Sequence, residues 1–226
     1  MKIIIIVPAR MGSRRLKGKV LKKLKKFSLL YILVNRLKKA KFVDKIVIST
    51  TKKREDNLIV KYCKKYKINF FRGSSLNVAK RISDTASYYK ATAFIRINGD
   101  SPLIDYRIID KAYKIFKNKK PDLVTNIFPR SFPVGQSVEI MKSKLLKDNL
   151  LKFKSKIYKE HVTKFFYKNK KKFKIINLKN PKNYSKKKFA IDTPKDLERL
   201  ENLNLTKKNL FKIDMKSIIR LSNEKI

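Results

Sequence analysis

Short apolar runs alternate with longer segments of helical period along most of this chain. Runs of about four to eight apolar residues bounded by turn residues are typical of buried strands, and apolar residues three and four positions apart indicate helices. The first half contains the expected strands 3–7, 45–49, 68–71, 93–97 and 123–127. The helical segments between them are 29–37, 58–66, 78–89 and 108–116. This alternation predicts an α/β fold with a mostly parallel sheet and helices on both of its faces.

The second half continues with shorter elements and shows no internal repeat. Strands are expected at 136–140, 173–178 and 188–191, and helices at 142–151, at 158–168 and in a final pair. Because 226 residues is the size of one domain, we expect residues 1–226 to form a single domain, with 201–226 as a C-terminal helical tail. No apolar stretch is long enough for a membrane span or a signal peptide, which favours a soluble, cytoplasmic protein.

Lysine and arginine outnumber aspartate and glutamate by 60 to 17, so the formal net charge is +43. Such an excess is typical of proteins that bind nucleic acid. Here, however, the lysines are spread over the whole chain and glycine is scarce, as expected when A- and T-rich codons accumulate. We therefore interpret the charge mainly as background. A basic nucleic-acid-binding protein stays as an alternative. Specific binding to nucleic acid that survives moderate salt would favour it.

The first strand runs directly into a basic loop with two glycines, from Pro8 to Lys19. Loops at the carboxyl ends of parallel strands are where open α/β sheets bind ligands. Gly12 and Gly18 let backbone N–H groups approach oxygen atoms closely, and the cations of the loop supply positive charge for a polyphosphate. The spacing is not that of a Walker A loop, because five residues separate the glycines and Val20 follows Lys19. A solvated basic loop is the alternative interpretation.

Two aspartates lie at later strand ends in the same way. Asp100 comes just after strand 93–97, and Asp192 lies between an expected strand and a helix start at Thr193. Carboxylates next to a phosphate loop suit Mg²⁺, which takes one or two protein carboxylates together with phosphate oxygens and water. The alternatives are an acid that begins a turn for Asp100 and an acid at a helix N-terminus for Asp192. We expect both carboxylates to meet the glycine loop in one pocket.

The chain has one cysteine, Cys63, and one histidine, His161, which excludes an intrachain disulfide and a zinc site built from cysteines. Cys63 lies in an apolar helical segment, where we expect a small buried hydrophobic residue rather than a nucleophile. His161 is interpreted either as a general base or as a packing or surface residue, and both interpretations stay open.

Together these segments resemble the cytidylyltransferase family that includes the spore-coat-polysaccharide cytidylyltransferase-like proteins and is related to the CMP-sialic-acid (acylneuraminate) and CMP-Kdo synthetases. The segments that carry the likeness are 8–19, 96–103 and 192–197, with further matches at 71–74, 132–139 and 160–163. They follow one another in the family's order over residues 1 to about 200. The resemblance implies a Rossmann-like, GT-A-like nucleotidyltransferase. Such an enzyme would transfer CMP from CTP to a sugar, expected to be acidic, with release of pyrophosphate, for surface polysaccharide.

The resemblance also implies roles for individual residues. The nucleotide-binding residues are expected to be Ala9, Arg10, Gly12, Ser13, Arg15 and Lys19. The catalytic residues are expected to be Lys19, Asp100 and Asp192, the two aspartates being the Mg²⁺ ligands. The sugar side is expected to hold Arg72, Ser74, Glu139, Glu160 and His161. The expected partners are CTP and a sugar, with no membrane, and the related synthetases favour a homodimer.

Three positions depart from the family pattern. Lys17 stands where proline is usual, Asn77 where an acid is usual, and Ser137 where an acid is usual. Two alternatives therefore stay open beside the cytidylyltransferase. One is a sugar nucleotidyltransferase or glycosyltransferase that uses another nucleotide, and the other is a catalytically inactive relative that serves as a binding subunit. Pyrophosphate release from each of the four nucleoside triphosphates separates these possibilities.

Overall fold

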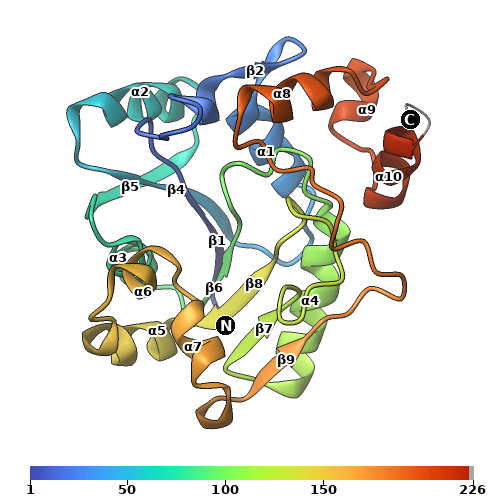
Figure 1. The fold of residues 1–226 in the computed structure, drawn as a ribbon. Helices are drawn as coiled ribbons and strands as arrows, with labels where there is room; N and C mark the ends of the chain where they lie inside the picture. Colours follow the sequence, from blue (N-terminus) through green and yellow to red (C-terminus); the bar gives the residue numbers. More distant parts are fainter. Residues whose placement is uncertain (224–226) are drawn as a thin grey trace.

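The computed structural model describes residues 1–223 and contains a seven-stranded sheet in the order β5-β4-β1-β6-β8-β7-β9 (Figure 1). The strands are β1 (Ile3–Pro8), β4 (Lys45–Thr51), β5 (Asn69–Gly73), β6 (Ala93–Arg96), β7 (Leu123–Thr125), β8 (Glu139–Lys142) and β9 (Ile175–Asn177). Strand β8 is antiparallel to both of its neighbours, and the other pairings are parallel. A short hairpin of β2 (Lys23–Leu24) and β3 (Phe27–Ser28) stands apart. The predicted α/β fold with a mostly parallel sheet is confirmed.

Strand β1 lies near the middle of the sheet and is buried on both of its faces. Successive side chains of a strand point to opposite faces, so Ile3, Ile5 and Val7 enter one hydrophobic core. Ile4 and Ile6 enter a second core on the other side of the sheet. Two covered faces explain why this strand is apolar throughout instead of alternating with polar residues.

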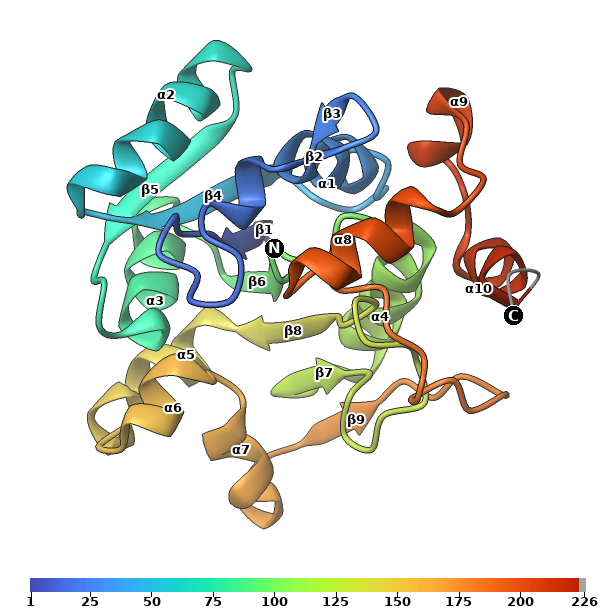
Figure 2. The ribbon, with the colours of Figure 1, turned by 45° about the horizontal axis from the view of Figure 1, so that its top comes forward.

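Helices cover both faces, as Figure 2 shows. The first core is closed by α1 (Leu29–Leu37), α2 (Asn57–Lys65), α4 (Tyr106–Lys119), α8 (Pro194–Glu201), α9 (Lys207–Leu210) and α10 (Met215–Asn223). The second core is closed by α3 (Val78–Tyr88), α5 (Ser143–Asn149), α6 (Lys156–Glu160) and α7 (Lys164–Lys168). Among residues 1–223, none of the helices combines the length and the apolar character that crossing a bilayer requires.

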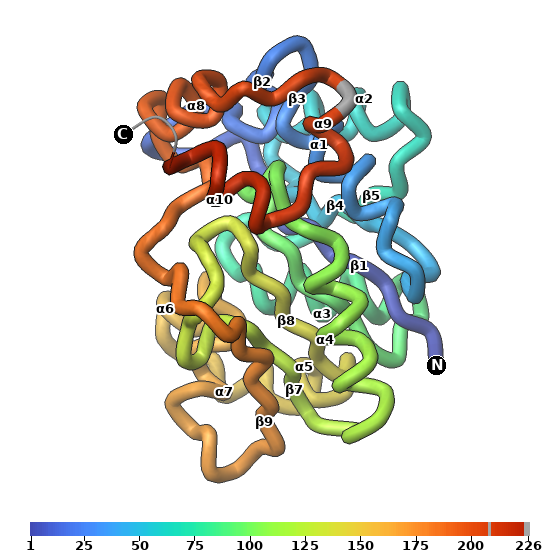
Figure 3. Tube along the Cα trace, turned by 90° about the vertical axis from the view of Figure 1, so that its right-hand side faces the viewer, coloured from blue at the N-terminus to red at the C-terminus, as the bar shows by residue number. Residues whose placement is uncertain are grey.

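The C-terminal helices are tied to the first core through a buried arginine of α1. The Arg36 guanidinium donates to the carbonyl oxygens of Ile104, Leu210 and Ile213 at 2.7, 2.9 and 2.6 Å. Burial lowers the pKa of Arg36 to about 10. These bonds hold the segment around α9 against α1, and Figure 3 shows α8 to α10 lying over this side of the molecule. The last three residues of the expected tail 201–226 lie outside the described residues.

Three expected elements differ from the structure. Strand β8 begins three residues later than predicted because the Asn126 side chain bonds Gln136 and Val138, which takes these residues out of the ladder. The helix expected at 158–168 breaks at His161 into α6 and α7, which lets Val162 enter the core. Within the part of the chain that the structure describes, segment 188–191 forms no strand of the sheet, and its one β-type contact is the bridge between Lys188 and Val134.

The chain changes direction across the sheet at β1. It runs from β1 outward to β4 and β5 on one side, and then returns to β6 on the other side of β1. The loops that leave the carboxyl ends of β1 and β6 therefore diverge. In open α/β sheets ligands bind in the crevice at such a switch point. The loops after β1 and β6 carry the glycine motif and Asp100, so the topology places both at this edge.

Candidate active site

The loop after β1 is folded back on itself and anchored to the next strand. The Met11 carbonyl oxygen accepts from the backbone N–H groups of Ser13 and Gly18, at 2.9 and 2.8 Å. Gly18 has a φ of 65°, a left-handed conformation that favours glycine. The Met11 N–H donates to Asp56 Oδ1 at 2.6 Å, and Thr51 also bonds this buried carboxylate. Asp56 was not identified from the sequence. The available signal was an acidic residue that follows a strand closely, in a chain with few acidic residues.

Lys19 joins the loop to both predicted metal ligands. Its Nζ lies 3.1 Å from Asp100 Oδ2 and 3.1 Å from Asp192 Oδ1. The three side chains are mostly buried yet keep some access to solvent. The structure therefore brings together three residues that are up to 173 positions apart in the chain.

Asp100 is held at this position by a close approach of its turn to β1. A Cβ atom at Gly99 would lie 2.9 Å from the Pro8 carbonyl oxygen, so only glycine lets the turn pack there without a shift of the backbone. The Asp100 carbonyl oxygen accepts from the Ile191 N–H at 2.8 Å, which brings the neighbouring Asp192 to the same place. A hydrogen bond from Ser101 Oγ to Asp100 Oδ1, at 3.0 Å, orients the carboxylate.

Asp192 is surrounded by cations and precedes a well-capped helix. Arg15 lies 3.1 Å from Oδ1 and Lys188 Nζ lies 3.3 Å from Oδ2, in addition to Lys19. Burial alone would raise the pKa of Asp192, but the hydrogen bond and charge of Lys19 and the charges of Arg15 and Lys188 hold it below its usual value. The Asp192 N–H donates to Asp196 Oδ2 at 3.0 Å, and Thr193 and Asp196 form a capping box at the start of α8. Lys188 and Asp196 were not identified from the sequence.

The carboxylates of Asp100 and Asp192 fit a divalent cation. Both present hard oxygen atoms to one position, which the Lys19 ammonium shares in this structure. Within residues 1–223 no group of three or more aspartate, glutamate, histidine or cysteine side chains gathers into a metal cage. Mg²⁺ needs no such cage, because it commonly binds through one or two carboxylates and takes its remaining ligands from phosphate and water.

Arg10 links the glycine loop to the helices of the second core. Its guanidinium lies 3.0 Å from Glu160 Oε1 at the end of α6, and both side chains are exposed. His161 follows Glu160 at the C-cap of α6 and is exposed. The structure thus brings an expected nucleotide residue into contact with an expected sugar-side residue.

The other loop residues expected to bind the nucleotide are Ala9, Gly12 and Ser13, which have short side chains or none. The Ala9 N–H donates to the Ser49 carbonyl oxygen at 3.1 Å and continues the pairing of β1 with β4. At Gly12 an added Cβ would meet Glu55 Oε1 at 2.8 Å, the flexible end of a side chain. Ser13 lies beside the turn that Met11 closes, with its side chain half-buried.

The side chains of Arg72 and Ser74 both form hydrogen bonds with backbone groups of neighbouring segments. Arg72 donates to the carbonyl oxygens of Thr51 and Lys53, at 2.9 and 3.0 Å, and braces the turn after β4. Ser74 Oγ accepts from the Asn77 N–H at 3.1 Å, just before Asn77 caps α3. In this structure both side chains therefore support the loops around the site.

Glu139 lies in a buried network between β6, β8 and α7. Its two carboxylate oxygens accept from Arg96, at 2.5 Å, and from the Tyr167 hydroxyl, at 2.6 Å. The Tyr167 hydroxyl also lies 2.7 Å from Thr125 Oγ1. Burial and the charge of Glu139 raise the pKa of Tyr167, so it stays a neutral donor. Arg96 and Tyr167, which the sequence analysis did not single out, thus occupy both oxygens of a residue expected on the sugar side.

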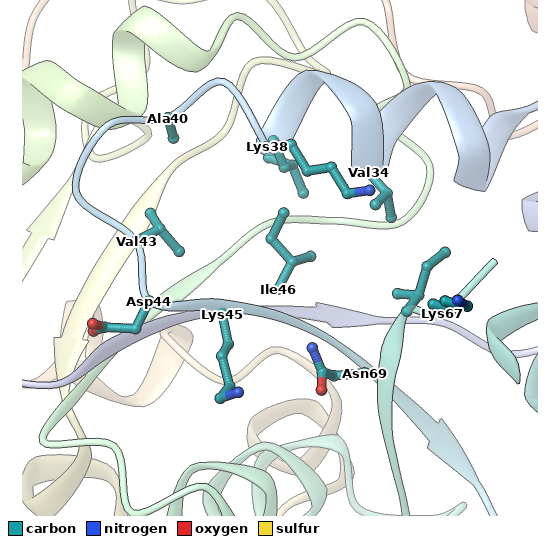
Figure 4. A pocket seen from close by; sticks show the side chains of 11 residues that line it. Val34, Lys38, Ala40, Val43, Asp44, Lys45, Ile46, Lys67 and Asn69 are labelled. Atoms are coloured by element: carbon teal, nitrogen blue, oxygen red, sulfur yellow. The ribbon is translucent and has the colours of Figure 1, made fainter.

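A cavity of about 290 Å³ is lined by none of the predicted site residues. Figure 4 shows the side chains that line it. It is lined by the end of α1 and by the starts of β4 and β5, including Lys38, Lys45 and Lys67. The starts of these strands are at the opposite edge of the sheet from the cluster around Lys19. The cavity therefore belongs to the amino edge and has no contact with the predicted chemistry.

Similarity to known proteins identifies the family of this chain. The sequence model described as Cytidylyltransferase matches residues 4–218. Spore coat polysaccharide biosynthesis protein SpsF of Bacillus subtilis (strain 168) is 30% identical over 208 residues, which are 89% of this chain and 85% of that protein.

Two solved structures agree with this result. A cytidylyltransferase from Leptospira borgpetersenii serovar Hardjo-bovis (strain JB197) has a TM-score of 0.88 at 31% identity, covering 100% of this chain and 99% of its own. A CMP:2-keto-3-deoxy-manno-octonic acid synthetase complexed with CTP has a TM-score of 0.70 at 15% identity, covering 90% and 98%, and this likeness concerns the fold alone. The resemblance found in the sequence is confirmed, and the chain belongs to the cytidylyltransferase family of nucleotidyltransferases.

Proposed function

We propose that this chain transfers CMP from CTP to a hydroxyl group of an acidic sugar and releases pyrophosphate, as a step toward surface polysaccharide. The observation that carries the proposal is the Lys19 ammonium, which lies 3.1 Å from both Asp100 and Asp192 at the switch point of the sheet. Membership of the cytidylyltransferase family supports CTP as the nucleotide, and the similarity to SpsF supports polysaccharide synthesis.

The residues of the glycine loop would stabilise the leaving pyrophosphate. In the reaction the sugar hydroxyl oxygen bonds to the α-phosphorus, the bond from that phosphorus to the pyrophosphate oxygen breaks, and the hydroxyl proton passes to water. Such transfers are accelerated mainly by positioning and by neutralising the charge on the phosphate oxygens. Arg10, Arg15 and Lys19 supply that charge, and the backbone N–H groups near Gly12 and Ser13 supply further donors.

Asp100 and Asp192 would hold a divalent cation, which we propose to be Mg²⁺. When bound, the ion supplies a Lewis acid for the α-phosphate. Because Lys19 shares these two carboxylates here, its ammonium has to give way, and the triphosphate offers it new oxygen partners. Lys19 is therefore proposed to exchange carboxylate for phosphate when substrate binds.

The sugar side is proposed to lie beside α6, where His161 is exposed and the Glu160 side chain is 44% exposed. Glu139 is proposed to position Arg96 rather than to touch the sugar, since its oxygens are occupied. At one of the departures from the family pattern, Asn77 Oδ1 accepts from the Lys80 N–H at 2.9 Å and caps α3. Asparagine and aspartate both cap helices well, so the amide of Asn77 keeps the cap that an acid would also form. The departure at this position therefore favours an active enzyme.

Pyrophosphate release tests the proposal directly. The purified protein is assayed with each of the four nucleoside triphosphates, Mg²⁺, and a panel of acidic sugars with their neutral counterparts. We expect release with CTP and an acidic sugar. Release with another nucleotide would assign a different sugar nucleotidyltransferase. No release by folded protein that also fails to bind CTP would overturn the proposal.

We further propose that the protein is a homodimer in the cytoplasm. Large apolar side chains are exposed on or beside helices that pack against one another. They are Leu76 in the turn before α3, Tyr88 at the end of α3, Leu151 after α5 and Ile157 in α6. Sedimentation equilibrium of the wild type and of Leu151→Asp measures the assembly. A monomeric wild type would rule out the dimer and leave the proposed reaction untouched.

A further inference from the structure

The cavity at the amino edge of the sheet takes no part in the proposed reaction, and its walls are largely apolar. The apolar side chains that line it are Val34 and Leu37 from α1, Ala40 and Val43 from the connection to β4, Ile46 from β4 and Ile68 just before β5. Ala40, Val43 and Ile46 are only half-buried, so apolar surface stays accessible inside the hollow. Sites for small ligands are typically hollows of this kind, mostly apolar with a few polar groups.

The walls of the cavity are fixed by backbone hydrogen bonds. At the end of α1 the Ala40 N–H donates to the Leu37 carbonyl oxygen at 3.0 Å, and before β5 the Ile68 N–H donates to the Cys63 carbonyl oxygen at 2.8 Å. Between these two segments, β4 is paired with β1. The cavity is therefore formed before any ligand arrives, and a ligand would not have to order the chain in order to bind.

Three lysines, Lys38, Lys45 and Lys67, also line the cavity. All three are exposed, and none of their ammonium groups forms an ion pair or a hydrogen bond with residues 1–223. Among the described lining residues Asp44 is the one acid, and its Oδ2 accepts from the Ile3 N–H at 2.6 Å. Figure 4 shows the Asp44 carboxylate at the left and Lys67 at the right of the cavity. The lining thus carries an excess of two positive charges beside an apolar floor.

Volume and charge together limit the class of ligand. Because a water molecule occupies ~30 Å³ of the liquid, a cavity of about 290 Å³ has room for roughly ten non-hydrogen atoms. A phosphate monoester carries about two negative charges at neutral pH, which equals the excess charge of the lining. A phosphate group on a short apolar body therefore matches both the volume and the charge.

We propose that this cavity binds a small phosphate monoester with an apolar body, at a site separate from the proposed reaction centre. The apolar body lies against Val43 and Ile46, where its burial releases water from both surfaces. The phosphate stays at the rim, where Lys38 and Lys67 approach it from two different elements and serve as point charges. The inference does not depend on the proposed function, because none of the lining residues belongs to that site.

The experiment compares a whole ligand with its two halves. Hexyl phosphate, hexanol and inorganic phosphate are titrated calorimetrically into the full chain. We expect one hexyl phosphate to bind per chain, at least about 10-fold more tightly than either half, because hexanol lacks the charge and inorganic phosphate lacks the apolar body. Saturating CTP should leave this affinity and stoichiometry unchanged.

Variants of the lining locate the binding. The double variant Lys38→Met with Lys67→Met removes two exposed cations from the rim and should weaken binding by about 10-fold. Val43→Phe fills the floor of the cavity and should abolish binding. Lys117→Met, at an exposed lysine of α4 outside the lining, is the matched control and should keep the affinity of the wild type. Thermal unfolding shows whether each variant is folded, and the lysine variant tests the site even if Val43→Phe is not.

Several results would overturn the inference. They are the absence of binding at millimolar hexyl phosphate, the affinity of the wild type in the double lysine variant or in folded Val43→Phe, and displacement of hexyl phosphate by CTP. Sedimentation with vesicles of phosphatidylcholine and phosphatidic acid that depends on Lys38 and Lys67, without binding of free hexyl phosphate, would overturn it in favour of a membrane surface. Failure to release pyrophosphate would instead count against the proposed function and leave this site untouched.

Discussion

Two groups of carboxylates and cations lie at the same edge of the sheet and differ in their access to solvent. Around Lys19, the side chains of Lys19, Asp100 and Asp192 are 16%, 24% and 20% exposed. Around Glu139, the carboxylate is 2% exposed and both of its oxygens are engaged by protein donors. Ion pairs that solvent can reach can exchange a protein partner for a ligand, whereas a buried pair cannot be opened without a large cost. The comparison supports the proposal that the first group handles substrate, whereas the contacts of the second group support the sheet.

The largest expected effect is on turnover, at the accessible group. Asp100→Asn keeps the shape of the side chain and removes the charge proposed to hold the cation. We expect turnover to fall by about 10³-fold or more, the size typical of losing a main electrostatic contribution to a transition state. Pyrophosphate release and thermal unfolding are measured together, and the unfolding temperature should change little.

A matched substitution shows whether this effect is specific. Asp84→Asn removes a half-buried carboxylate of α3 that pairs with Lys80 and has no bond to the glycine loop, Asp100 or Asp192 among the described residues. Its turnover should equal that of the wild type. Equal turnover in Asp100→Asn as well would show that Asp100 holds no metal ion needed for the reaction.

At the buried group the expected effect is on stability. Glu139→Ala leaves Arg96 as a mostly buried cation without its partner, and the buried Nε of Arg96 already lacks a hydrogen bond. Breaking a buried ion pair in this way costs about 3 kcal/mol or more. Urea unfolding of Glu139→Ala and of Tyr167→Phe measures this, and the tyrosine variant should lose about 2 kcal/mol, because its hydroxyl group bonds a buried carboxylate. A change near zero in Glu139→Ala would remove the distinction between the two groups.

Acid should weaken the ion pairs of Asp192 and Asp196. The folded-state pKa of Asp192 is lowered, chiefly by Lys19 against the effect of burial, and that of Asp196 is lowered by Lys188. Groups with lowered pKa values stabilise the fold above their ordinary pKa, ~3.9, and this contribution is lost as pH falls from there toward the folded-state value. Unfolding by urea at several pH values below 5 should therefore show a smaller loss of stability in Asp192→Asn than in the wild type. Parallel curves would show that these pairs add nothing.

The smallest expected effect is at Arg15, which pairs with Asp192 from the rim. Its side chain is 65% exposed, so solvent screens the pair. Arg15→Met should change the free energy of unfolding by no more than about 0.5 kcal/mol. If Arg15 neutralises the triphosphate, the same variant raises the KM for CTP although its free energy of unfolding changes little. An unfolding loss as large as that of Glu139→Ala would contradict the view that accessibility separates the two groups.

The sequence predicted the order of elements well where each element is determined locally. The Ser28 cap, whose Oγ accepts from the Tyr31 N–H at 3.2 Å, begins α1 where it was expected. The predicted burial of Cys63 is confirmed, and desolvation raises its pKa to about 12, so it is an inert core thiol. Strand β8 was less well predicted, because the Asn126 side chain takes the backbone bonds of Gln136 and Val138. The 188–191 segment was also less well predicted, because its backbone N–H groups bond to the loop residues Val134 and Asp100.

What the amino-acid sequence by itself determined is the α/β class, the family and the residues with suitable chemistry, because hydrophobic period, glycine positions and charge are properties of short segments. Only the tertiary structure decided which of those residues share one place. Lys19 meets Asp100 and Asp192 because β1 and β6 are neighbours and because residue 191 bonds residue 100. Glu139 is withdrawn from solvent because Tyr167 and Arg96 cover it. Such contacts join residues far apart in the chain, and no local pattern in a single sequence encodes the distance between them.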